Sequence, residues 1–99
     1  MPLGRSRDVM ASLYGFAFTE AALEYLESTI PAKIRGQIKR RIEKLAANPV
    51  PPGCKKLIGV TDGEHPVYRV RQGDYRIIYS VRPVIIVILD IDHRKDVYR

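Results

Sequence analysis

The sequence predicts an α+β domain in which two helices pack on one face of a sheet. Apolar residues recur at helical spacing between residues 19 and 48, and the period changes to that of strands from residue 67 onward. The length of 99 residues fits one domain of this kind. We therefore expect an N-terminal strand, a two-helix hairpin and a three-strand antiparallel meander, in this order.

The first half of the chain predicts one short strand and two helices. Loose alternation over Leu13–Phe18 indicates the strand. Thr19 suits the N-cap of the first helix, which should end near Thr29 because Pro31 disfavours a helical conformation in the residue before it. Pro31 also suits the first turn of the second helix, and Asn48-Pro49 should end that helix.

The second half of the chain predicts three strands, Val67–Gln72, Asp74–Val81 and Val84–Ile91. The short turns between them require antiparallel neighbours. The last strand is apolar on both faces, so we expect it in the middle of the sheet. The proline-rich segment 49–53 is interpreted as a stiff linker. Residues 1–12 are interpreted as a flexible N-terminal extension of a domain that spans residues 13–99.

The charge distribution indicates a polyanionic partner. The chain has 17 Lys and Arg against 11 Asp and Glu, a net charge of +6. Residues 19–30 hold three glutamates and no basic side chain, so the remainder is more basic than the total suggests. Such a body is typical of proteins that bind nucleic acid or an anionic membrane surface. A basic surface that serves only solubility is the alternative.

Several kinds of site are disfavoured. One cysteine and two histidines exclude an internal disulfide and argue against a Cys/His zinc site. A lone cysteine suits a reducing cytoplasm, and the longest apolar run, Val84–Leu89, is too short to span a bilayer. The sequence has no Gly-rich phosphate loop and no acidic cluster, so we expect no metal or cofactor. Asp90 and Asp92 are expected to pair with Arg94 or Lys95.

Strand alternation predicts a cluster of arginines on one face of the sheet, because side chains two residues apart share a face. The residues expected under the helices are Tyr68, Val70, Ile77 and Tyr79. Arg69, Arg71 and Arg76 then project from the uncovered face. Their fork geometry suits a phosphate bound among them, and ordinary solvent-exposed arginines on an open sheet are the alternative.

The C-terminal segment carries three further candidate groups, His93, Arg94 and Tyr98. An imidazole exchanges protons near neutral pH. A tyrosine can stack on a base or pass a proton. Taken alone, His93 is better interpreted as a turn residue and Tyr98 as a packed aromatic.

Five short motifs lie in order along the chain: YGFAFT at 14–19, KLIG at 56–59, VYRVR at 67–71, GDYRIIY at 73–79 and HRKDVY at 93–98. Each motif is degenerate alone. The ordered set resembles the RelE/ParE superfamily of toxins from toxin–antitoxin pairs, and it is most similar to the RelE branch. The last two motifs are the most specific, and the resemblance covers roughly residues 13–99.

The resemblance implies a ribosome-dependent endoribonuclease that cleaves mRNA without a metal, by attack of the 2′-hydroxyl on the adjacent phosphate. Arg76 and Arg94 match residues that bind the scissile phosphate, and Tyr98 matches a C-terminal tyrosine that stacks on or activates the substrate. Arg69 and Arg71 stand where well-known members carry lysine, and an arginine holds its proton. The base would then be His93, Tyr98 or a ribosomal group.

The same resemblance implies further contacts. Substrate binding is expected from Arg69, Arg71, Lys55 and Lys56, and rRNA docking from Lys33, Lys39, Arg40 and Lys44. An acidic antitoxin, RelB-like or of another class, would bind the toxin in a hetero-oligomer. Two other functions stay open: a ParE-like toxin that inhibits DNA gyrase, and a basic RNA-binding homologue without catalysis.

Overall fold

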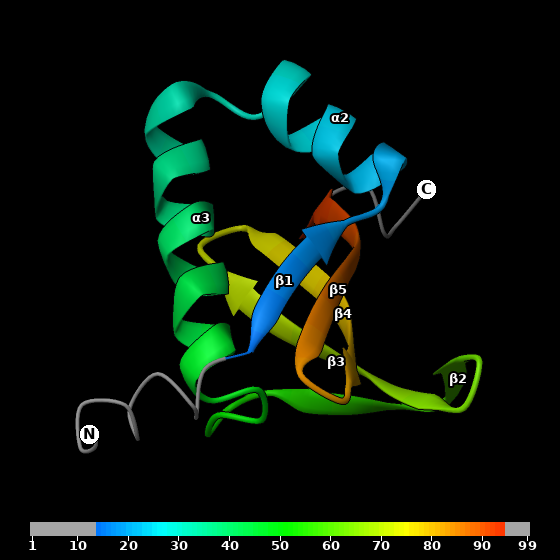
Figure 1. The fold of residues 1–99 in the computed structure, drawn as a ribbon. Helices are drawn as coiled ribbons and strands as arrows, with labels where there is room; N and C mark the ends of the chain where they lie inside the picture. Colours follow the sequence, from blue (N-terminus) through cyan, green and yellow to red (C-terminus); the bar gives the residue numbers. More distant parts are fainter. Residues whose placement is uncertain (1–13, 95–99) are drawn as a thin grey trace, which may run out of the picture.

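A mixed five-stranded sheet is covered on one face by two helices in the computed structural model, which describes residues 14–94 (Figure 1). The elements are β1 (Gly15–Phe18), α2 (Glu20–Ser28), α3 (Ala32–Ala47), β2 (Lys55–Asp62), β3 (His65–Gln72), β4 (Tyr75–Arg82) and β5 (Ile85–His93). The predicted fold class and the order of the predicted elements are confirmed. The predicted extension, residues 1–12, lies outside the described residues.

The strands follow the order β1-β5-β4-β3-β2. β1 runs parallel to β5, and the other neighbours are antiparallel. β5 lies between β1 and β4, so the last strand is internal, but the middle position that the sequence predicts for it belongs to β4. The meander has one strand more than the sequence predicts, because β2 follows the proline-rich segment. The register of β2 with β3 shifts between Lys56 and Thr61, and this irregularity hides the alternation in the sequence.

The hydroxyl of Thr19 caps the N-terminus of α2 and also links this helix to the sheet. Its Oγ1 accepts a hydrogen bond from the N–H of Ala22 at 3.2 Å and donates one to the carbonyl of Leu89 in β5 at 2.9 Å. The turn between the helices is fixed by Arg35, whose Nη2 donates to the carbonyl of Ile30 at 3.1 Å. Within residues 14–94, neither helix has the length and apolar composition needed to cross a membrane.

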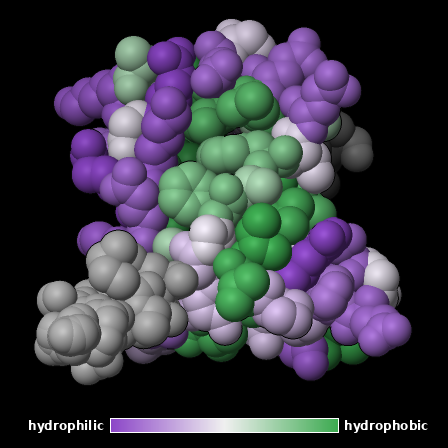
Figure 2. Space-filling view, in the orientation of Figure 1, coloured by the Kyte–Doolittle hydropathy of each residue, from purple (hydrophilic) through white to green (hydrophobic). Residues whose placement is uncertain are grey.

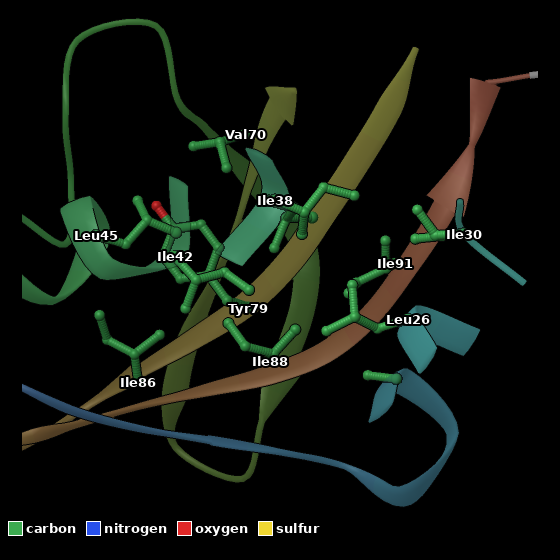
Figure 3. Close-up of a cluster of buried hydrophobic side chains, with 12 residues drawn as sticks. Leu26, Ile30, Ile38, Ile42, Leu45, Val70, Tyr79, Ile86, Ile88 and Ile91 are labelled. Carbon is green, nitrogen blue, oxygen red and sulfur yellow. The ribbon is translucent and has the colours of Figure 1, made fainter. Parts of the chain in front are cut away.

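The core lies between the helices and the sheet (Figure 3). Ile38 and Ile42 of α3 meet Ile77 and Tyr79 of β4, and none of the four side chains is exposed. The Tyr79 hydroxyl donates to the carbonyl of Pro49 at 2.7 Å, so its polar end is satisfied. Burial raises the pKa of this hydroxyl. The helix-covered face is therefore the one that alternation predicts.

A bulge in β5 decides which of its side chains face the helices. The register of β4 with β5 shifts by one residue at Leu89. Ile88 and Ile91 therefore both enter the core, although strict alternation would place them on opposite faces. Asp90 and Asp92 consequently face the open side of the sheet. The bulge thus brings carboxylates to the face that holds the predicted arginines.

Candidate nucleic-acid interface

The side of the sheet away from the helices gathers four basic residues, Lys55, Arg69, Arg71 and Arg76, which we call the arginine face. Lys55 pairs with Arg69 across β2 and β3, and Arg71 pairs with Arg76 across β3 and β4. Side chains of paired residues point to the same side of a sheet. The predicted clustering of Arg69, Arg71 and Arg76 on one face is therefore confirmed.

Three arginines meet at a small hollow beside the turn between β3 and β4. The hollow has a volume of about 90 Å³ and is lined by Arg71, Gly73, Asp74, Tyr75, Arg76 and Arg94. We call it the turn hollow. Gly73 has a φ of +61°, a conformation that glycine adopts readily in a tight turn. The structure thus brings Arg76 and Arg94, the two residues expected to bind the scissile phosphate, into one site.

Two of these arginines are held by carboxylates. Nε of Arg76 donates to Oδ1 of Asp92 at 3.1 Å, and these side chains are only 15% and 26% exposed. Nε of Arg94 lies 3.1 Å from Oδ1 of Asp74, and both of these side chains are more than half exposed. Both contacts use Nε, so the donors on the Nη atoms point elsewhere. Each guanidinium is fixed at one edge while its other edge can meet an anion.

The prediction that Asp92 pairs with Arg94 is wrong. Asp92 pairs with Arg76 instead, because the bulge places Asp92 directly opposite Arg76. Burial and the neighbouring Asp92 raise the pKa of Asp90. Arg71 and Arg76 stand opposite each other, and like charges in this position destabilise a sheet. Asp92 offsets that repulsion, so the hollow keeps its arginines close together.

His93 lies on the other side of the sheet. It pairs with Tyr75, and the two rings meet edge to face with centroids 4.9 Å apart. Tyr75 packs against the core under the helices. The structure therefore does not bring His93 together with Arg76. Tyr98 lies outside the described residues, so its role stays a prediction.

The remaining predicted binding residues occupy different surfaces. Arg40 and Lys44 line a hollow between α3 and the end of β3, which we call the helix hollow. Lys33 lies exposed in the first turn of α3, and Lys39 lines an apolar groove further along the same helix. Lys56 pairs with Tyr68, so it points away from the arginine face.

The apolar groove runs between β1, α2 and α3 and has a volume of about 310 Å³. Its lining is Phe16, Phe18, Leu23, Leu26, Glu27, Lys39, Ile42 and Glu43. Figure 2 shows hydrophobic surface gathered over this region, beside the hydrophilic surface of α3. Phe16 is 43% exposed and Leu23 is 40% exposed. The sequence did not predict this groove, although two phenylalanines on a short strand were a usable signal.

The other end of the open face holds a hydrogen-bond network. The buried hydroxyl of Ser80 donates to Oδ2 of Asp62 at 2.7 Å, and Nη2 of Arg82 donates to the same oxygen at 2.6 Å. These hydrogen bonds lower the pKa of Asp62. The network joins β2 to β4 across β3 and so fixes the hairpin that carries Lys55.

The described residues offer positive charge and hydrogen-bond donors rather than metal ligands. Within residues 14–94, no three His, Cys, Asp or Glu side chains gather as a metal site. Fixed guanidinium groups stabilise charge that develops on phosphoryl oxygens. The turn hollow is therefore suited to binding a phosphate and to stabilising a reaction at it.

Comparison with known proteins identifies the family. The ParE toxin family of type II toxin–antitoxin systems, parDE, matches residues 16–98. A chain of the archaeal RelE–RelB complex from Pyrococcus horikoshii OT3 is 31% identical with a TM-score of 0.71, and the match covers 83% of this chain and 96% of that one. A chain of the RelB–RelE antitoxin–toxin complex from Methanococcus jannaschii is 28% identical with a TM-score of 0.65, over 83% and 94% of the two chains.

A third similar structure is the toxin–antitoxin complex RelBE2 from Mycobacterium tuberculosis, with 27% identity, a TM-score of 0.69 and coverage of 83% and 92%. No curated protein matches the sequence. The family match extends over nearly the whole domain, and the fold agrees with those of the RelE–RelB complexes. This chain is therefore a toxin of the RelE/ParE superfamily, and it belongs to the ParE toxin family of type II toxin–antitoxin systems.

Proposed function

We propose that the protein cleaves mRNA on the ribosome, in the cytoplasm, as a RelE-like endoribonuclease. The observation that carries this proposal is the convergence of Arg71, Arg76 and Arg94 on one small hollow, with Arg76 and Arg94 held by carboxylates. The similarity to chains of RelE–RelB complexes supports the same branch.

In the proposed reaction, the 2′-hydroxyl oxygen forms a bond to the adjacent phosphorus while the bond from phosphorus to the 5′-oxygen breaks. The products are a 2′,3′-cyclic phosphate and a 5′-hydroxyl, whose leaving oxygen takes up a proton from water. In-line placement of the nucleophile contributes about 7–11 kcal/mol. Each well-placed guanidinium adds about 3–4 kcal/mol, by analogy with oxyanion-hole donors. Arg76 and Arg94 bind the non-bridging oxygens, and Arg69, Arg71 and Lys55 hold the flanking strand.

The proton of the 2′-hydroxyl needs an acceptor. His93 packs against Tyr75 on the helix side, so it is poorly placed to serve the turn hollow. The arginines hold their protons. We therefore assign this step to Tyr98 or to a ribosomal group, and Tyr98→Phe separates the two, because a ribosomal base survives that substitution.

Primer extension on translated mRNA tests the proposal after expression of the wild type, Arg76→Ala and Arg76→Lys. We expect ribosome-dependent cuts with the wild type and a loss of about 10²–10³-fold with Arg76→Ala. Arg76→Lys keeps the charge but loses the planar fork, so it should recover only part of the activity. Equal cuts with wild type and Arg76→Ala, or none with the wild type, would contradict the proposal.

The match to the ParE toxin family favours a second candidate, inhibition of DNA gyrase. A supercoiling assay with purified protein distinguishes the two. Inhibition that survives Arg76→Ala would favour this candidate, because the turn hollow has no role in it. Growth arrest on induction separates both toxins from a binding homologue without activity.

We also propose that an antitoxin binds this toxin in a hetero-oligomer, because the similar structures are complexes of a toxin with its antitoxin. The net charge of +6 suits an acidic partner. The groove with the exposed Phe16 and Leu23 offers apolar surface for such a chain to cover.

A further inference from the structure

The helix hollow is a second basic site on the opposite side of the sheet from the turn hollow. Its volume is about 280 Å³, and its lining is Gln37, Arg40, Arg41, Lys44 and Gln72. All five side chains carry N–H donors. No carboxylate lines it among the described residues. The hollow is therefore built to accept an anion.

Arg41 lines this hollow and carries a buried donor without a partner among the described residues. Its Nε is buried, and it has no hydrogen-bond acceptor within the described part of the chain. A buried donor without an acceptor costs about 1–3 kcal/mol, and more when the group is charged. Native proteins leave few such groups, and a bound ligand is one way to satisfy them.

The two hollows are adjacent along the chain. Arg71 lines the turn hollow, and the next residue, Gln72, lines the helix hollow. Consecutive residues of a strand point to opposite faces, and β3 ends at Gln72, where only Gly73 and Asp74 separate it from β4. A polynucleotide that crosses this short turn can therefore reach both hollows.

We propose that the helix hollow binds a backbone phosphate of the RNA other than the one that is cleaved. This inference rests on the proposed RNA substrate. A tetrahedral phosphate presents acceptor oxygens in several directions, which suits donors that come from both α3 and β3, and guanidinium forks match it well. The arginines here have no carboxylate partners in the hollow, so the site contributes affinity and positions the strand.

NMR on the full-length ¹⁵N-labelled toxin tests the site directly. The first probe is a short single-stranded RNA with methylated 2′-hydroxyls, which cannot be cut. The second is a glutamate-rich peptide that represents an acidic protein partner. We expect the Nε–H signal of Arg41 and the side-chain amide of Gln72 to shift to saturation with the RNA. No shift with RNA, or a shift with the peptide alone, would overturn the proposal.

Three variants test the same site by fluorescence anisotropy with that RNA over a range of salt concentrations. Lys44→Gln should reduce the slope of log affinity against log salt by about 0.7, the loss of one phosphate contact. Gln72→Glu keeps the shape but adds a carboxylate, so the affinity should fall about tenfold. Lys39→Gln removes the same charge from the same helix but outside the hollow. The rRNA that Lys39 is expected to dock is absent from this assay, so the slope should stay unchanged. Equal slopes for Lys44→Gln and Lys39→Gln would refute a specific contact.

Failure of this inference is distinguishable from failure of the proposed function. If the wild type cuts mRNA but the Nε–H signal of Arg41 does not shift with the RNA, only the assignment of the helix hollow as a phosphate site is incorrect. If the Arg41 signal responds to RNA but no mRNA is cut, the site stands and the endoribonuclease assignment fails. Arg76→Ala should lose cleavage and still show the Arg41 shift.

Discussion

Arg76 and Ile77 are neighbours in β4, but they serve opposite sides of the sheet. Ile77 is fully buried among the core residues under the helices, whereas Arg76 lines the turn hollow on the open side. The helix side is stabilised by apolar burial, and the open side holds its charges in place with carboxylates. A step of one residue thus separates the part of the strand that maintains the fold from the part that can bind phosphate.

Substitution of Ile77 should have the largest effect on stability. Ile77→Ala is expected to lower the free energy of unfolding by about 2–5 kcal/mol, because it leaves a cavity in a closely packed core. Urea denaturation measures this change. Ile77→Val is the graded control, with an expected loss of about 0.5–1.5 kcal/mol. If Arg76→Ala destabilises the protein as much as Ile77→Ala does, the separation between the two faces is incorrect.

The carboxylate that holds Arg76 should matter less for stability and more for activity. Asp92→Asn is expected to lower kcat for cleavage about tenfold, or about 1.4 kcal/mol, because Arg76 loses its fixed orientation. RNA affinity should be unchanged or higher, since a negative charge is removed, and this split between kcat and KM marks Asp92 as a positioning residue.

Asp74→Asn is the matched control for Asp92→Asn. Its pair with Arg94 has side-chain exposures of 62% and 63%, and exposed ion pairs contribute about 0–1 kcal/mol. Its effect on kcat should therefore be the smaller one. A larger effect of Asp74→Asn than of Asp92→Asn would show that burial of the ion pair is not what fixes the arginines.

The pH dependence of stability tests the role of Asp62 on the open face of the sheet. Hydrogen bonds from Arg82 and Ser80 lower its pKa in the folded protein, whereas an unfolded aspartate titrates near 3.9. The resulting stability is complete above about pH 3.9 and is lost as the pH falls through the lowered folded value. Asp62→Asn should therefore reduce the melting temperature at neutral pH and make its decline in acid shallower.

Asp90→Asn is the control of opposite sign for this pH test. Burial and Asp92 raise the pKa of Asp90, so its ionised form costs stability above the folded pKa. The melting temperature of Asp90→Asn at neutral pH should be equal to or higher than that of the wild type. A loss of stability in this variant, equal to that of Asp62→Asn, would contradict the assignment of the two carboxylates.

Much of the fold follows from local signals in the sequence. Thr19 and Pro31 mark helix boundaries through capping and steric rules that act within a few residues. Alternation likewise assigned the arginines correctly, because β3 and β4 pair without a register shift. β2 was not predictable, because its irregular pairing breaks the period of two between Lys56 and Thr61.

The candidate site was predictable only in part, because its remaining features depend on register and on contacts between distant segments. The bulge at Leu89 brings Asp92 to Arg76, and pairing with Tyr75 carries His93 to the helix side. The helix hollow forms only when α3 lies beside the end of β3, so the position of Arg41 in the sequence gave no sign of it.

Because of the bulge at Leu89, the faces of the β5 side chains depend on the number of residues in this strand as well as on their types. Leu89 is the extra residue opposite β4, so its deletion would leave Ile88, Asp90 and Asp92 on their present faces. The same deletion would remove the carbonyl that accepts from the hydroxyl of Thr19. A single-residue deletion here would thus keep the phosphate site in register while removing one of two hydrogen bonds from Thr19 to β5, because its N–H also donates to the carbonyl of Ile88 at 3.0 Å.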